Sequence, residues 1–94
     1  MATFLMFGKY SAQAMQEMSP GRTQKVRDKV RELGGEVQAI YAVLGRKDLL
    51  LIVNLPGIEA AVKASLALGR MTGISFTTSP ALPVEEFDRL IGEV

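Results

Sequence analysis

The segment from Leu49 to Val53 is apolar at every position, and this run constrains the fold more than any other feature of the sequence. Successive side chains of a strand point to opposite faces of a sheet, so this strand is apolar on both faces and needs cover on both. The sequence has only two substantial helical segments, and short crossover connections place both on one face. We expect a second copy of the chain to cover the other face, because monomers rarely tolerate so large an apolar surface.

Four strands are predicted from short runs that are apolar or alternate between apolar and polar residues. Their expected bounds are Thr3–Lys9, about Glu36–Leu44, Leu49–Val53 and Gly73–Ser79. The segment Gly45-Arg46-Lys47-Asp48 forms the turn between the second and third strands, and Pro80 closes the fourth.

Two helices are predicted between these strands. The first starts at Ser19-Pro20, an N-cap followed by a first-turn proline, and ends at Gly34-Gly35. The second spans Ile58–Arg70, where four alanines let the helix lie flat on the sheet. Three larger residues of this helix are expected to fill space in the core: Val62, Leu66 and Leu68. A short C-terminal helix begins at Val84, and we expect it to pack on its own sheet or on that of a partner.

The order strand-helix-strand-strand-helix-strand predicts an α+β, ferredoxin-like fold. Its four-stranded sheet is antiparallel, with the two helices on one face and the short helix at the C-terminal end. The 94 residues suffice for one domain, spanning residues 1–94.

The composition narrows the possible chemistry. The chain has no cysteine and no histidine, which removes disulfides, thiolate catalysis, and the commonest metal ligand and general base. We therefore expect no cofactor and no metal site. The N-terminal residues lack the pattern of a signal peptide, and no apolar run is long enough to cross a bilayer, so we expect a cytoplasmic protein without a membrane partner. A net charge of +1 provides no strong field for nucleic acid.

Four motifs resemble those of the GYD-domain family of small bacterial and archaeal proteins. They are Gly8-Lys9-Tyr10, Leu33-Gly34-Gly35-Glu36-Val37, Gly45-Arg46-Lys47-Asp48 and Ala60-Ala61. The resemblance implies a ferredoxin-like fold, self-association of the dimeric α/β-barrel type and no established activity. The family's motif has an aromatic residue before the aspartate, where this chain has Lys47.

The chain is also distantly similar to the effector-binding domains of leucine-responsive transcription regulators, which have a comparable glycine-aspartate turn before a strand. Those regulators carry a separate DNA-binding domain. This sequence opens directly on a strand, so we expect no such domain here.

Six residues are candidates for ligand binding: Tyr10, Tyr41, Asp48, Arg70, Ser75 and Thr77. Asp48 is a possible acid, base or ligand anchor, but the simpler interpretation is a hairpin turn with Arg46 and Lys47 in solvent. The tyrosines offer hydroxyls to a pocket between sheets, or simply end their strands. Ser75 and Thr77 line either a polar cavity on the uncovered face or a strand that faces water.

The leading hypothesis is a non-catalytic homo-oligomeric module that binds a small molecule between sheets or at the subunit interface. No residue is assigned as catalytic. The alternative is a cofactor-independent enzyme that acts on a hydrophobic small molecule, with Asp48, Tyr41 or Arg70 near the reacting group. A third hypothesis, nucleic-acid binding, is disfavoured because acidic residues interrupt the basic ones of the first helix and no aromatic residue lies among them.

Overall fold

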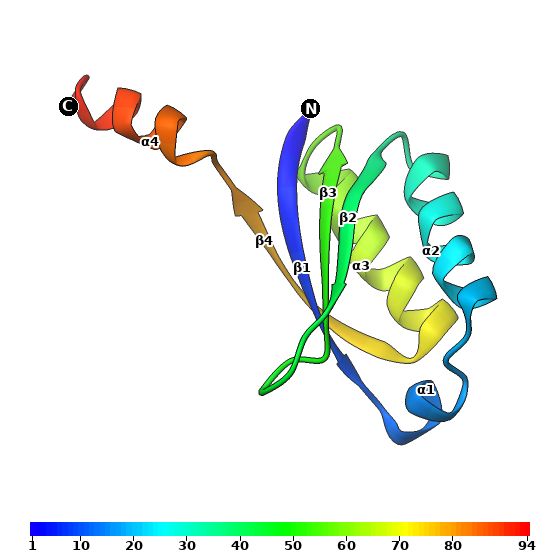
Figure 1. Ribbon diagram of the computed structural model, residues 1–94. Coiled ribbons are helices and arrows are strands. Elements are labelled where there is room, and N and C mark those ends of the chain that lie inside the picture. Colours follow the sequence, from blue (N-terminus) through cyan, green and yellow to red (C-terminus); the bar gives the residue numbers. More distant parts are fainter.

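The computed structural model describes residues 1–94 and confirms the α+β, ferredoxin-like arrangement (Figure 1). The elements are β1 (Ala2–Tyr10), α1 (Ala12–Gln16), α2 (Pro20–Glu32), β2 (Glu36–Ala42), β3 (Leu49–Leu55), α3 (Ile58–Thr72), β4 (Ile74–Ala81) and α4 (Val84–Ile91). The sheet order is β2-β3-β1-β4, and every neighbouring pair is antiparallel. The helices α2 and α3 lie on one face of this sheet (Figure 1). No helix has the length and apolar character needed to cross a membrane.

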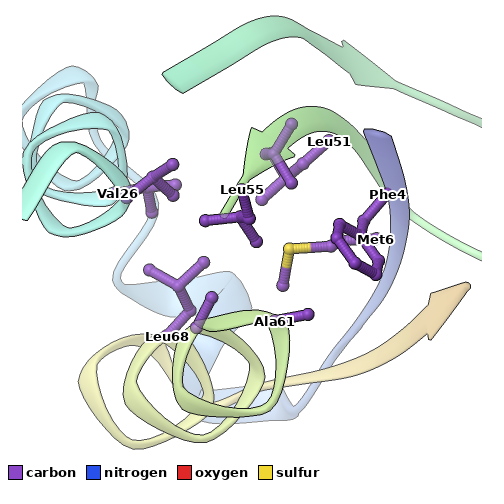
Figure 2. Close-up of a cluster of buried hydrophobic side chains, with 10 residues drawn as sticks. Phe4, Met6, Val26, Leu51, Leu55, Ala61 and Leu68 are labelled. Carbon is purple, nitrogen blue, oxygen red and sulfur yellow. The ribbon is translucent and has the colours of Figure 1, made fainter. Parts of the chain in front are cut away.

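The core lies between the sheet and the pair α2 and α3. Figure 2 shows Phe4 and Met6 of β1 pointing toward the side chains of the two helices, beside Leu51 and Leu55 of β3. The largest fully buried side chains are Met6, Leu51, Leu55, Leu68, Val30 and Val53. Every second side chain of the two central strands, β1 and β3, therefore faces the helices and forms the sheet side of the core, because successive side chains of a strand point to opposite faces.

Local signals set both ends of α2. The Ser19 hydroxyl accepts a hydrogen bond from the Arg22 backbone N–H at 3.1 Å, which satisfies one of the free N–H groups at the start of the helix. Gly34, at a φ of +88°, turns the chain after the helix. The next residue, Gly35, passes so close to β3 that a Cβ atom there would overlap the carbonyl oxygen of Asn54. The Gly34-Gly35 pair thus fixes how the chain enters β2.

The bounds of β2 and β4 differ from those predicted. β2 ends at Ala42, because Gly45, at a φ of +121°, turns the following segment, and Leu44 is fully exposed in the loop. β4 starts after Gly73 and continues through Pro80, which lies opposite Phe4, so Pro80 does not close the strand. β4 is an edge strand, where a proline need not donate a hydrogen bond to a second neighbour.

The prediction for the packing of α3 was correct for one of the three large residues. Leu68 is fully buried, but Val62 and Leu66 are 52% and 58% exposed. The helix rests on the sheet through Ala61, Ala64 and Leu68, and it lies close to the edge strand β4. Val62 and Leu66 project on the side of α3 where the sheet ends, so no strand covers them.

The C-terminal helix α4 does not pack on its own sheet. None of its residues is buried, and Figure 1 shows it directed away from the sheet, α2 and α3. Its projection contributes to a radius of gyration of 14.2 Å, whereas a compact chain of this length has about 12 Å. The expectation that α4 packs on its own sheet is therefore wrong, and its packing on a partner stays a prediction.

Candidate functional site

The sheet face opposite the helices, here called the open face, has an apolar centre. Strand pairing places Leu5 opposite Ile52, and Phe7 opposite Leu50. These four residues alternate with the buried residues of β1 and β3, so their side chains point away from α2 and α3. All four are half-buried by their neighbours, and together they form an apolar square on the two central strands.

Polar and small residues border the apolar square on both sides. On β4, Ser79 lies opposite Leu5 and Thr77 lies opposite Phe7. The flanking residues of β2 are Ala39 and Tyr41. At one end of the face, the Thr3 hydroxyl donates a hydrogen bond to the Asn54 side-chain oxygen at 2.9 Å. The open face is therefore an apolar patch with a polar margin rather than a uniformly apolar surface.

Lys47 forms part of the opposite margin, a role that the sequence did not indicate. Its Nζ donates a hydrogen bond to the Thr77 hydroxyl at 3.3 Å, which connects the β2–β3 loop to β4. The sequence-based interpretation placed Lys47 in solvent beside a turn. No local pattern signals this contact, because it depends on the sheet order that brings β4 near the loop.

Asp48 is held by contacts with the end of β1. Its carboxylate accepts a hydrogen bond from the Tyr10 backbone N–H at 2.9 Å and lies 3.6 Å from the Lys9 ammonium. The Asp48 backbone N–H donates to the Gly8 carbonyl at 2.9 Å, and its carbonyl accepts from the Val43 N–H at 3.0 Å. Asp48 thus fastens the loop to β1, which is a structural role more specific than that of an ordinary turn residue.

Tyr10 lies on the helix side of the sheet and not on the open face. Its ring borders a small hollow of about 40 Å³ at the end of the core, together with Val26 and Leu49. The Arg22 guanidinium lies 5.6 Å from the ring centroid, and it also donates a hydrogen bond to the Ala14 carbonyl. This geometry closes the core and favours the interpretation of Tyr10 as the end of a strand.

The remaining candidates divide between two places. Tyr41 and Thr77 lie on the open face in the same row as Phe7 and Leu50, and Ser75 lies in the adjacent row. Arg70 is exposed on the last turns of α3 and borders a shallow depression at the β4 edge, which Ser75 also lines. The structure therefore brings Tyr41, Thr77 and Ser75 to one face and places the Lys9–Asp48 pair at the end of that face, in the row of Ser75. Tyr10 and Arg70 lie apart from the apolar square.

The arrangement suits binding better than acid–base chemistry. The ion pair between Lys9 and Asp48 lies at the end of the open face, in the row of Ser75, and there the Asp48 carboxylate is held by Lys9 and by the Tyr10 N–H. No group of three acidic side chains comes together to hold a metal ion. Tyr41 and Thr77 supply hydroxyls at the margin, where they can orient a mostly apolar molecule.

Solved structures with the same fold include two bacterial regulators. The leucine response regulatory protein of Mycobacterium tuberculosis gives a TM-score of 0.59 at 11% identity, covering 87% of this chain and 51% of that chain. An AsnC family transcriptional regulator from Agrobacterium tumefaciens gives a TM-score of 0.59 at 20% identity, with coverages of 87% and 50%. The chain thus spans about half the length of these proteins, and at such identities the likeness shows the fold alone.

No match was found among curated proteins. The profile of the GYD domain, in contrast, matches residues 4–91, which is nearly the whole sequence. This match confirms the resemblance inferred from the glycine motifs and the turn before β3. The chain belongs to the GYD domain family.

Proposed function

We propose that the protein is a non-catalytic homo-oligomeric module in which two copies associate through their open faces, in the manner of a dimeric α/β barrel. The observation that carries this proposal is the apolar square, formed by Leu5, Phe7, Leu50 and Ile52, inside its polar margin. An apolar centre with a polar rim is typical of protein–protein interfaces. Burial of these side chains from both copies removes apolar surface from water and stabilises the pair.

The proposal extends to a small, largely apolar ligand held between the two sheets. Tyr41 and Thr77 lie beside the apolar square and offer hydroxyls that fix a ligand's orientation, while the square provides the apolar wall. The likeness of fold to a leucine response regulatory protein supports a regulatory role for such binding.

The alternative, a cofactor-independent enzyme, has weaker support. It would place Asp48, Tyr41 or Arg70 beside a reacting group. The Asp48 carboxylate already interacts with the Tyr10 N–H and with Lys9, and Arg70 projects from α3 on the other side of the sheet. These groups do not converge on one place, whereas catalysis needs positioned groups within hydrogen-bond reach.

The proposal includes a cytoplasmic location and no nucleic-acid or membrane partner, as expected from the sequence. The net charge of +1 supports the absence of strong, nonspecific attraction to nucleic acid. Cell fractionation checks the location. Salt-dependent retention of the protein on DNA or RNA would contradict the expectation for nucleic acid.

Light scattering coupled to gel filtration tests the self-association. Ile52→Lys places a charge in the apolar square, and a buried residue of this kind contributes about 2 kcal/mol or more, so association should weaken about thirtyfold or more. Met18→Lys is the matched control, because Met18 is exposed in the segment between α1 and α2. A wild-type monomer at micromolar concentration, or equal effects of the two substitutions, would refute the open-face dimer.

Native mass spectrometry of protein purified gently from its own host tests the ligand. A multimer with a reproducible extra mass, lost in a Tyr41→Ala and Thr77→Ala double variant that still forms the multimer, is the expected result. A bare multimer that binds no apolar compound in screening would refute the ligand part and leave the association intact.

A further inference from the structure

Two apolar surfaces outside the open face have no partner within the chain. The first is one side of α4. Val84, Phe87 and Ile91 are spaced by three and four residues, so they share one face of the helix, and each remains more than half exposed. The isolated helix in Figure 1 has nothing to cover this face.

The second surface is a groove of about 350 Å³ between α3 and the edge strand β4. Ile58, Val62 and Leu66, spaced by four residues, expose their side chains along one side of it. Phe4, Ala61 and Pro80 complete the apolar lining, and only the paired hydroxyls of Ser65 and Thr78, 2.6 Å apart, interrupt it. The groove thus has an apolar lining of the kind that receives one face of a short helix.

The junction between β4 and α4 directs the helix away from the chain's own groove. Pro80 and Pro83 hold the residues before them, Ser79 and Leu82, in extended conformations. Pro83 itself has φ −57° and ψ 144°, which continues the direction of the strand. With this stiff extended junction, α4 is positioned to reach another molecule and not to fold back.

The charges of the arm and of the rest of the chain are complementary. Residues 84–94 contain four acidic side chains and one arginine, which gives a net charge of −3, so the remaining residues carry +4 of the total of +1. Arg89 is already paired with Glu86 and Glu93. Asp88, which borders the apolar face of α4, has no ion-pair partner, and neither do Lys63 and Arg70 on the exposed side of α3.

We propose that α4 is an arm that binds a second copy of this chain, with Val84, Phe87 and Ile91 seated in that copy's groove between α3 and β4. The acidic residue Asp88 then approaches Arg70 of the partner copy, which borders a depression shared with the groove residues Ser65 and Leu66. This contact is separate from the open face and links copies that the open face does not join. It also gives Arg70 a role in assembly, in place of the ligand-binding role expected from the sequence.

Cross-linking between single-cysteine variants tests the arm, because the natural chain has no cysteine. Ile91→Cys on α4 and Leu66→Cys in the groove are prepared separately, mixed and treated with a short bis-maleimide. Glu85→Cys is the control, on the opposite face of α4. At micromolar protein, a docked arm raises the local concentration of the two thiols toward millimolar, so the Ile91→Cys mixture should give about tenfold more mixed dimer than the Glu85→Cys mixture.

Two further variants make the result decisive. Phe87→Asp, added to the Ile91→Cys chain, should abolish the mixed dimer, because it places a charge in the apolar contact. The double variant with Ile91→Cys and Leu66→Cys in one chain should give cross-linked dimers rather than internally closed monomers. Equal yields from the two faces of α4, or internal closure at all protein concentrations, would overturn the inference.

The same assay separates this inference from the open-face dimer. Ile52→Lys disrupts only the open face, so cross-linking of the arm should persist in that background. If circular dichroism shows that the Ile52→Lys variant does not fold, the Leu50→Gln variant is used as the open-face variant instead. If a folded open-face variant loses the cross-link, the arm does not bind independently and the inference is refuted. If the arm still cross-links but Ile52→Lys has no effect on the association of the protein, only the proposed open-face dimer is refuted.

Discussion

Replacement of Asp48 by alanine separates a structural role for this carboxylate from a ligand-binding role. The substitution removes the acceptor of the Tyr10 N–H hydrogen bond at 2.9 Å and the partner of Lys9 at 3.6 Å. A hydrogen bond to a charged group contributes about 1.5–3 kcal/mol to stability. The Asp48 side chain is 24% exposed, so water can replace part of this interaction, and the ion pair with the exposed Lys9 adds little. We expect a loss of about 1–2 kcal/mol in the free energy of unfolding.

For a domain of this size, that loss lowers the melting temperature by roughly 5–15 °C. Thermal unfolding followed by circular dichroism measures it, with every variant at the same protein concentration because association also stabilises the fold. Asp48→Asn keeps an acceptor oxygen and should lose about half as much. Asp28→Ala is the control, since Asp28 is exposed and its carboxylate accepts one hydrogen bond, from the Gln24 side chain. A melting temperature for Asp48→Ala equal to that of the control would refute the structural role and restore Asp48 as a candidate for binding.

Two further substitutions test the packing of the helices and the entry into β2. Leu68→Ala removes a fully buried side chain and should lower the free energy of unfolding by about 2–5 kcal/mol, measured by chemical denaturation. Leu66→Ala removes a side chain that is 58% exposed and should change the free energy of unfolding of the monomer by less than about 0.5 kcal/mol. Equal losses from the two substitutions would contradict the observed orientation of α3. Gly35→Ala brings a Cβ onto the Asn54 carbonyl and should destabilise the fold by about 1–3 kcal/mol. Gly21→Ala in α2 is the control and should leave the stability of the fold unchanged or slightly higher. If Gly35→Ala does not change stability, then Gly35 does not lie so close to β3.

The sequence alone was sufficient to predict the order of the elements and the two-sided character of the central strand. The run from Leu49 to Val53 indicated a strand without a polar face, and the structure places its alternate residues in the core and on the open face. Ser19 and the pair Gly34-Gly35 predicted the ends of the first main helix for local reasons, namely capping and backbone freedom. These features depend on residues close together in the chain, so the pattern reveals them.

The candidate site was predicted less completely, because it joins residues that are distant in the sequence. Periodicity predicted that Ser75 and Thr77 share the more polar face of their strand, but it did not indicate that Lys47 reaches Thr77 or that Asp48 binds the end of β1. Both contacts follow from the strand order β2-β3-β1-β4, which no single segment encodes.

The sequence by itself determined the order and approximate bounds of the main strands and helices, and it determined that the central strand is apolar on both faces. Only the tertiary structure decided which apolar residues are covered. Val62 and Leu66 have the same apolar character as Leu68, yet they remain exposed because α3 lies at the edge of the sheet, where no strand reaches them. Likewise, the helical spacing of Val84, Phe87 and Ile91 predicts an apolar face, but the extended junction at Pro83 decides that this face points away from the chain's own core. Burial depends on the positions of all the elements in space, whereas the local sequence sets only which apolar side chains each helix or strand presents.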